Sequence, residues 1–309
     1  MQGLTLSKQF FEHCQPELMA SIPDLMAKAC VGLVGEGSEC FGLDDDVSKD
    51  HDFGAAFCLW WPREFLKANL SKIEEALGKL PTSFQGYPSR LLPAYRQGRV
   101  GPLSIEGFYL RFLGLEQAPL NSAEWMKIEE YQLACCTNGE VFVDNLGQFS
   151  AIRAKLLEFY PQEVWLTKIA GKCMQMAQAG QYNLPRSLAR KDDITVFLAK
   201  ARFCEAALAC VALLNKHYLP FYKQAAKVVV NLPILGQELH LLLQNLARET
   251  EFSLEDQVDE IEAFCGQVSD FLQQNGFSSA RGAWLWDHGP SIMQKVKDPF
   301  LRKQDLLHI

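Results

Sequence analysis

The stretch that decides the fold lies at residues 37–52, which read GSECFGLDDDVSKDHD. The residues before it, 28–36, read KACVGLVGE and predict the end of a helix followed by a short apolar strand. Gly37 and Ser38 therefore fall at the end of that strand. Glycine has no side chain to keep a ligand from the backbone, and exposed amides together with a serine hydroxyl can donate to phosphate oxygens. We predict a phosphate-binding turn at Gly37 and Ser38.

An acidic pair closes the same stretch. Residues 52–61, DFGAAFCLWW, predict a second strand, and the alternation of a strand places Asp50 and Asp52 on one face and His51 on the other. Two neighbouring carboxylates repel unless a cation lies between them, and hard oxygen ligands are those that Mg²⁺ prefers. We predict that Asp50 and Asp52 hold Mg²⁺ or Mn²⁺. The alternative is a solvated acidic loop, which the flanking strands and the Gly-Ser turn disfavour.

These residues carry a resemblance to a known family. The block from Gly37 to Gly54 closely resembles the signature of the DUF4037 family, a branch of the polymerase-β-like nucleotidyltransferase superfamily. Further segments that resemble the family are VFVDNLG at 141–147, Ile152-Arg153, Tyr160-Pro161, Val164-Trp165, LNKHYLPFYK at 214–223 and Leu232-Pro233. The resemblance implies an α+β fold, with a small mixed-sheet nucleotidyltransferase core at residues 1–150 and an α-helical bundle domain at residues 151–309.

The resemblance also implies an activity. It is the magnesium-dependent transfer of a nucleoside monophosphate from a nucleoside triphosphate to a hydroxyl-type acceptor, with release of pyrophosphate. Within the acidic loop at 44–46, Asp45 is the residue expected to approach the site. From the helical half, the residues expected against the nucleotide are Asn215, Tyr218 and Lys223. A solvated helix face is the alternative interpretation of Lys223.

Members of the superfamily carry a third acid that helps to deprotonate the acceptor. The resemblance places that acid near Arg99-Val100-Gly101-Pro102, where this chain has Gly101. Glu106 and Asp144 are the candidates to replace it. We take Glu106 as the candidate catalytic residue, with an exposed turn residue as the alternative, and interpret Asp144 as a capping or turn residue. Without a third acid, the competing function is a catalytically degenerate nucleotide sensor or interaction module.

Net charge and composition indicate which classes of partner and which compartment to expect. The net charge of −7 argues against a long nucleic acid, because phosphate backbones require basic surfaces. A small-molecule acceptor is therefore favoured, while a protein side chain or a tRNA end stays open. The 10 cysteines are scattered in apolar contexts, typical of reduced thiols. The N-terminus lacks the pattern of a signal peptide, and no apolar run reaches membrane length. We expect a cytoplasmic protein without a membrane partner.

Periodicity predicts the remaining elements. A helical pattern at residues 4–30 is interrupted by Pro16 and Pro23, and Pro62 begins a helix to about Leu80. The segment 81–102 is loop-like and locally basic; its arginines Arg90, Arg96 and Arg99 could face a triphosphate, although a solvated loop explains each one alone. A strand is predicted at 140–144. Helices are predicted at 151–159, 163–179, 192–216, 220–230, 235–247 and 254–274.

Overall fold

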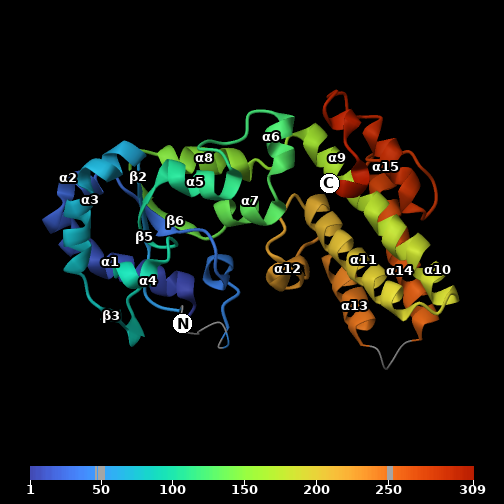
Figure 1. Ribbon diagram of the computed structural model, residues 1–309, viewed down its shortest axis with the longest axis horizontal. Coiled ribbons are helices and arrows are strands. Elements are labelled where there is room, and N and C mark those ends of the chain that lie inside the picture. Colours follow the sequence, from blue (N-terminus) through green and yellow to red (C-terminus); the bar gives the residue numbers. More distant parts are fainter. Residues whose placement is uncertain (46, 48–52, 249–252) are drawn as a thin grey trace. The chain divides into compact units, whose positions relative to one another are not determined.

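The computed structural model of the chain describes residues 1–45, 47, 53–248 and 253–309 (Figure 1). The chain forms two compact units. The first comprises Met1–Pro119 and Ile128–Glu158, and the second comprises Leu120–Lys127 and Phe159–Ile309. The sequence analysis placed the domain boundary near residue 150. In the structure the first unit extends to Glu158, and residues 120–127 belong to the second unit. The predicted α+β class is confirmed, since a mixed sheet with helices precedes a largely helical region.

The first unit is built on a sheet whose strand order is β5-β2-β1-β6. The strands are β1 (Cys30–Leu33), β2 (Cys58–Trp61), β5 (Gly101–Ser104) and β6 (Glu140–Asp144). Strand β1 pairs antiparallel with β2 and with β6, and β2 pairs parallel with β5. The sheet is therefore mixed, and the turn that follows β1 lies at the same end of the sheet as the beginnings of β2 and β5.

Helices cover both faces of this sheet. The helices of the first unit are α1 (Gly3–Ser21), α2 (Pro23–Met26), α3 (Arg63–Gly78), α4 (Pro93–Arg96), α5 (Ile105–Leu113), α7 (Glu130–Thr137) and α8 (Gln148–Leu157). The unit also contains η1 (Ser38–Phe41) and a hairpin of β3 (Ser83–Phe84) and β4 (Tyr87–Pro88). Adjacent tryptophans in β2 show the two faces. The Trp60 ring stacks on Phe149 of α8 with centroids 4.3 Å apart, whereas Trp61 donates to the Leu25 carbonyl at 2.9 Å. Both faces are buried, which explains why β2 is apolar throughout.

One expected interruption is wrong. Helix α1 runs through Pro16 and ends at Ser21, just before Pro23 begins α2. A proline inside a helix removes one hydrogen bond and crowds the preceding turn. Here the helix continues because its inner face is fully buried at Leu6, Phe10 and Leu18. Tertiary packing therefore outweighs the local cost of Pro16.

The second unit is helical. Its elements are α6 (Ser122–Lys127), α9 (Gln162–Met176), η2 (Ala177–Asn183), α10 (Leu184–Ala189), α11 (Asp193–Leu214), α12 (Tyr222–Val229), α13 (Gly236–Ala247), α14 (Leu254–Gln274), α15 (Leu285–Met293), η3 (Leu301–Lys303) and η4 (Leu306–His308). The helices predicted from residue 192 onward are confirmed. The one predicted at 163–179 passes instead into the π-helical η2, where a Cβ at Gly180 would lie 2.4 Å from the Phe203 ring.

In the described ranges, no helix combines the length and apolar composition that crossing a membrane requires.

Candidate functional site

The predicted phosphate-binding turn begins where β1 ends. Gly35 and Gly37 adopt φ values of +132° and +118°, which favour glycine, and Gly37 precedes the short helix η1. Gly42 ends that helix in the left-handed region, at φ +65°. Glycines with positive φ therefore stand on both sides of η1, and Gly37 and Ser38 follow shortly after the carboxyl end of β1, as the sequence predicted.

Asn138 holds the start of this turn. Its Nδ2 donates to the Gly35 carbonyl at 2.7 Å, and its Oδ1 accepts from the Gly35 amide at 3.0 Å. The next residue, Gly139, donates its amide to the Cys40 carbonyl at 2.8 Å. The two residues just before β6 therefore hold the turn on both sides, at Gly35 and at Cys40. Sequence reasoning did not select Asn138; the only local signal was an Asn-Gly pair directly before a predicted strand.

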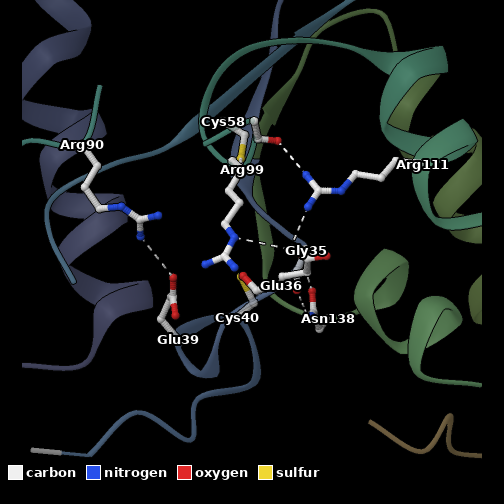
Figure 2. A network of polar contacts seen from close by, with 10 residues as sticks. Gly35, Glu36, Glu39, Cys40, Cys58, Arg90, Arg99, Arg111 and Asn138 are labelled. Atoms are coloured by element: carbon white, nitrogen blue, oxygen red, sulfur yellow. Dashed lines mark hydrogen bonds and ion pairs between the residues drawn. The ribbon is translucent and has the colours of Figure 1, made fainter. Parts of the chain in front are cut away.

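Three arginines surround the turn, each from a different segment (Figure 2). Arg90 follows β4, and its Nη1 lies 3.6 Å from Oε1 of Glu39. Arg99 precedes β5 and Arg111 lies in α5; both contact Oε2 of Glu36, at 3.3 Å from Nε and 2.8 Å from Nη2 respectively. Two glutamates of the turn are therefore paired with three guanidinium groups.

The arginines differ in burial. The side chain of Arg90 is 10% exposed, whereas those of Arg99 and Arg111 are 37% and 40% exposed. Arg96 is also covered, at 11% exposed, and pairs with Glu74. The solvated-loop interpretation is therefore wrong for Arg90 and Arg96, because the loop folds back and buries them against glutamates. Arg99 and Arg111 combine fixed positions with access from solvent.

Within the turn, the side chain of Glu39 lies directly against Gly37. A Cβ at Gly37 would come within 2.4 Å of its Oε2, so this side chain takes the space that a larger residue at 37 would need. Burial raises the pKa of Glu39, while the charge of Arg90 acts in the opposite direction. A phosphate at Gly37 would have this carboxylate as a neighbour. It therefore needs positive charge beside it, which Arg90 and Arg99 supply.

Two thiols fix the backbone of the cluster. Cys58 Sγ donates to the Arg99 carbonyl at 3.2 Å, and Cys40 Sγ donates to the Glu36 carbonyl at 3.5 Å. Burial raises the pKa of Cys58 to about 12, so its thiol keeps its proton and remains a donor. All ten cysteines are free thiols, in agreement with the reduced state expected from the sequence.

A cavity of about 240 Å³ lies on the α5 side of the turn. Its apolar wall is formed by Leu103, Phe108 and Phe112, and its polar rim includes Glu36, Arg99 and Arg111. The cavity lies wholly within the first unit, between the turn, β5 and α5.

The predicted metal ligands, Asp50 and Asp52, lie outside the described residues. The chain re-enters the described part at Phe53 and Gly54. A Cβ at Gly54 would lie 3.0 Å from Cγ of Arg90, so the segment that follows the acidic pair runs beside that arginine. In the described ranges no group of three or more His, Cys, Asp or Glu side chains could hold a metal ion. Asp45 is exposed, just after the turn.

Glu106 lies elsewhere. Its Oε2 accepts from the Arg63 amide at 2.9 Å, at the beginning of α3 and past the carboxyl end of β2. Because β1 and β2 are antiparallel, with Gly32 opposite Cys58, the turn after β1 lies at the other end of the sheet. The structure does not bring Glu106 together with Gly37 and Ser38.

Asp144 accepts from the amides of Gly147 and Ser150, at 3.0 and 2.8 Å. Its interpretation as a capping residue is confirmed. Gly101, where the resemblance places a third acid, has φ +82°, and a Cβ there would lie 2.8 Å from Cδ of Arg96. An acid at 101 would therefore require both backbone strain and movement of Arg96.

The residues predicted from the helical half lie in the second unit. Asn215 donates to the carbonyls of Val211 and Ile234 at 2.7 and 2.9 Å and accepts from the Ile234 amide at 2.9 Å, which anchors the segment before α13. Tyr218 is 6% exposed and packs on the aromatic rings of Phe159 and Tyr160. Lys223 is exposed on α12. Their approach to a nucleotide stays a prediction.

Comparison with known proteins gives a partial family assignment. Residues 125–224 match a family described as Domain of unknown function (DUF4037). The DUF4037 match covers about a third of the chain, from α6 into α12, and includes Asn138, Asn215, Tyr218 and Lys223. It does not include the stretch at 37–52. Searches among curated proteins and among solved structures return no match.

Proposed function

We propose that this chain belongs to the nucleotidyltransferase superfamily and transfers a nucleoside monophosphate from a nucleoside triphosphate to a hydroxyl-type acceptor, releasing pyrophosphate. The observation that carries the proposal is the position of Arg90. Its guanidinium pairs with Glu39 of the Gly-Ser turn, and its aliphatic stem lies beside Gly54, two residues after Asp52. Both sides of the motif therefore lie next to the same buried arginine.

This arrangement supports phosphate binding. Gly37 and Ser38 would contribute backbone amides and a hydroxyl to phosphate oxygens, and Arg99 would contribute a charged donor that is already fixed by Glu36. The guanidinium of Arg90, next to Glu39, would offset the repulsion between that carboxylate and a triphosphate. Because these groups are already in position before the ligand binds, less conformational entropy is lost on binding.

Asp50 and Asp52 are the residues that would hold Mg²⁺, and their two carboxylates suit a hard cation. When bound, the ion would supply neutralisation of triphosphate charge and alignment of the acceptor oxygen. Lys223 remains the candidate to assist from the helical unit. The net charge of −7 supports a small acceptor over a long nucleic acid.

A nucleotide sensor without transfer activity is the second candidate, and Gly101 favours it. Gly101 pairs with Cys58 at the end of the sheet where the turn lies, the end at which a third acid would act. Arg96 lies over that position instead, and Glu106 is at the opposite end. Such a site would still bind nucleotide but would lack the acid that helps to deprotonate the acceptor.

The test begins with calorimetric titration of each nucleoside triphosphate, with and without Mg²⁺, into the wild type and the Asp50→Asn/Asp52→Asn variant. We expect magnesium-dependent binding that the double change weakens by at least about tenfold. The matched control is Asp259→Asn/Asp270→Asn, which removes two exposed carboxylates from α14 in the second unit. Absence of binding by the wild type would contradict both the transferase and the sensor.

Pyrophosphate release then separates the two candidates. The wild type is incubated with its preferred nucleotide, Mg²⁺ and a panel of small hydroxyl-bearing acceptors. Release that depends on an acceptor and is lost in the Asp50→Asn/Asp52→Asn variant supports the transferase, whereas tight binding without release across the panel supports the sensor.

A further inference from the structure

The cavity beside α5 shares Glu36 and Arg99 with the phosphate-binding proposal, which uses neither its apolar wall nor Arg111. Its volume of about 240 Å³ has room for roughly eight waters, and therefore for one ring-sized group. Phe108 and Phe112 provide an apolar wall, with ring centroids 5.1 Å apart. A ligand in this cavity would bury an apolar body against these rings.

The rim of the cavity is suited to an anion. Arg111 donates from Nη1 to the Gly98 carbonyl and from Nη2 to Glu36, each at 2.8 Å. These contacts use two of the five N–H donors of a guanidinium group and hold it in place. Arg99 reaches the same Glu36 carboxylate, so one anion is shared by two cations at the rim (Figure 2). A second anion would find a fixed, partly solvated guanidinium there.

We propose that this cavity is an acceptor subsite for small organic acids, molecules that carry a carboxylate or phosphate on an apolar, ring-sized body. The identification of the ligand as the acceptor rests on the proposed transferase function. Arg111 would bind the acid group, and the apolar body would lie against Phe108 and Phe112. Glu36 would hold Arg111 in position and, by its own charge, limit the affinity for the acid.

Ligand-observed NMR titration of the full chain tests the subsite. The probes are phenylacetate, phenyl phosphate and the neutral phenylacetamide, at millimolar concentrations without nucleotide or metal. We expect both acids to bind and the amide to bind at least about fivefold more weakly, as expected for loss of one charged contact. A stronger response to phenyl phosphate or to phenylacetate identifies the preferred acid group. Equal binding of the amide would overturn the assignment.

Two variants are expected to move affinity in opposite directions. Arg111→Gln should weaken phenylacetate binding by about tenfold, and Glu36→Gln should strengthen it by about threefold to fivefold, because it removes a competing anion. Misfolding would weaken binding in both. Arg302→Gln, an exposed arginine of the second unit, is the matched control and should leave the affinity unchanged. Weaker binding in the Glu36→Gln variant would refute the proposed role of the rim.

The same variants separate this inference from the proposed function. Titration with magnesium and nucleoside triphosphate should give the same affinity in Arg111→Gln as in the wild type, since the phosphates are assigned to Gly37, Ser38 and Arg99 and not to Arg111. Acid binding without nucleotide binding would keep the subsite and reject the transferase. Nucleotide turnover without acid binding would keep the transferase and reject the subsite.

Discussion

The contact of Asn138 with Gly35 leads to a quantitative prediction for Asn138→Ala. The change removes two hydrogen bonds, of 2.7 and 3.0 Å, to the backbone of a buried residue. Each such bond contributes about 0.5–1.5 kcal/mol net, and each buried backbone group left unpaired costs about 1–3 kcal/mol. The contact is only partly buried, so water can replace part of the loss. We expect a local destabilisation of about 2–4 kcal/mol.

Hydrogen exchange followed by mass spectrometry measures this effect where it occurs. A loss of about 2–4 kcal/mol corresponds to exchange that is faster by about 30-fold to 900-fold, at about 1.36 kcal/mol per factor of ten. The increase should appear in peptides that cover β1 and the turn at 34–42, and not in peptides from α11. The local readout is preferable to a single unfolding midpoint, because a chain of two units need not unfold in one step.

The control is Asn69→Ala. Asn69 lies in α3, and its side chain donates to the Phe65 carbonyl of its own helix, at 2.8 Å. Exchange in the turn should stay at the wild-type rate in this variant. A change of less than about threefold in the Asn138→Ala turn peptides would refute the reasoning, since it would mean that the two hydrogen bonds contribute less than about 0.7 kcal/mol together.

Two further predictions concern carboxylates. Because burial raises the pKa of Glu39 above its ordinary value of 4.5, the folded state favours the protonated form, and stability is lost as the pH rises through the folded pKa. Glu39→Gln should therefore gain stability relative to the wild type as the pH rises above about 4.5 in denaturant titrations; a constant difference would contradict the burial argument. Glu106→Gln keeps an acceptor for the Arg63 amide, and we expect unchanged pyrophosphate release, whereas a fall of more than about a hundredfold would establish a catalytic role.

Local pattern was sufficient for most of the fold. Apolar runs and turn residues predicted β1, the Gly37-Ser38 turn and the strand at 140–144, because strand and turn signals lie within a few residues of each other. Helices α11 to α14 of the second unit followed from periodicity for the same reason, whereas α10 and α15 were not predicted. Pro16 was misinterpreted, since the burial that keeps α1 continuous depends on residues distant in sequence.

The sequence by itself identified Gly37, Ser38 and the acidic stretch as the candidate site, because glycine geometry and carboxylate pairs carry their chemistry locally. Only the tertiary structure decided which side chains surround the turn. Asn138 and Arg111 come from segments more than seventy residues away, with sequence separations of 103 from Gly35 and 75 from Glu36. The tertiary structure also showed that Glu106 lies away from the turn. Strand β1 runs antiparallel to β2 whereas β5 runs parallel to β2, so the segment after β5, which holds Glu106, lies at the opposite end of the sheet from the turn after β1.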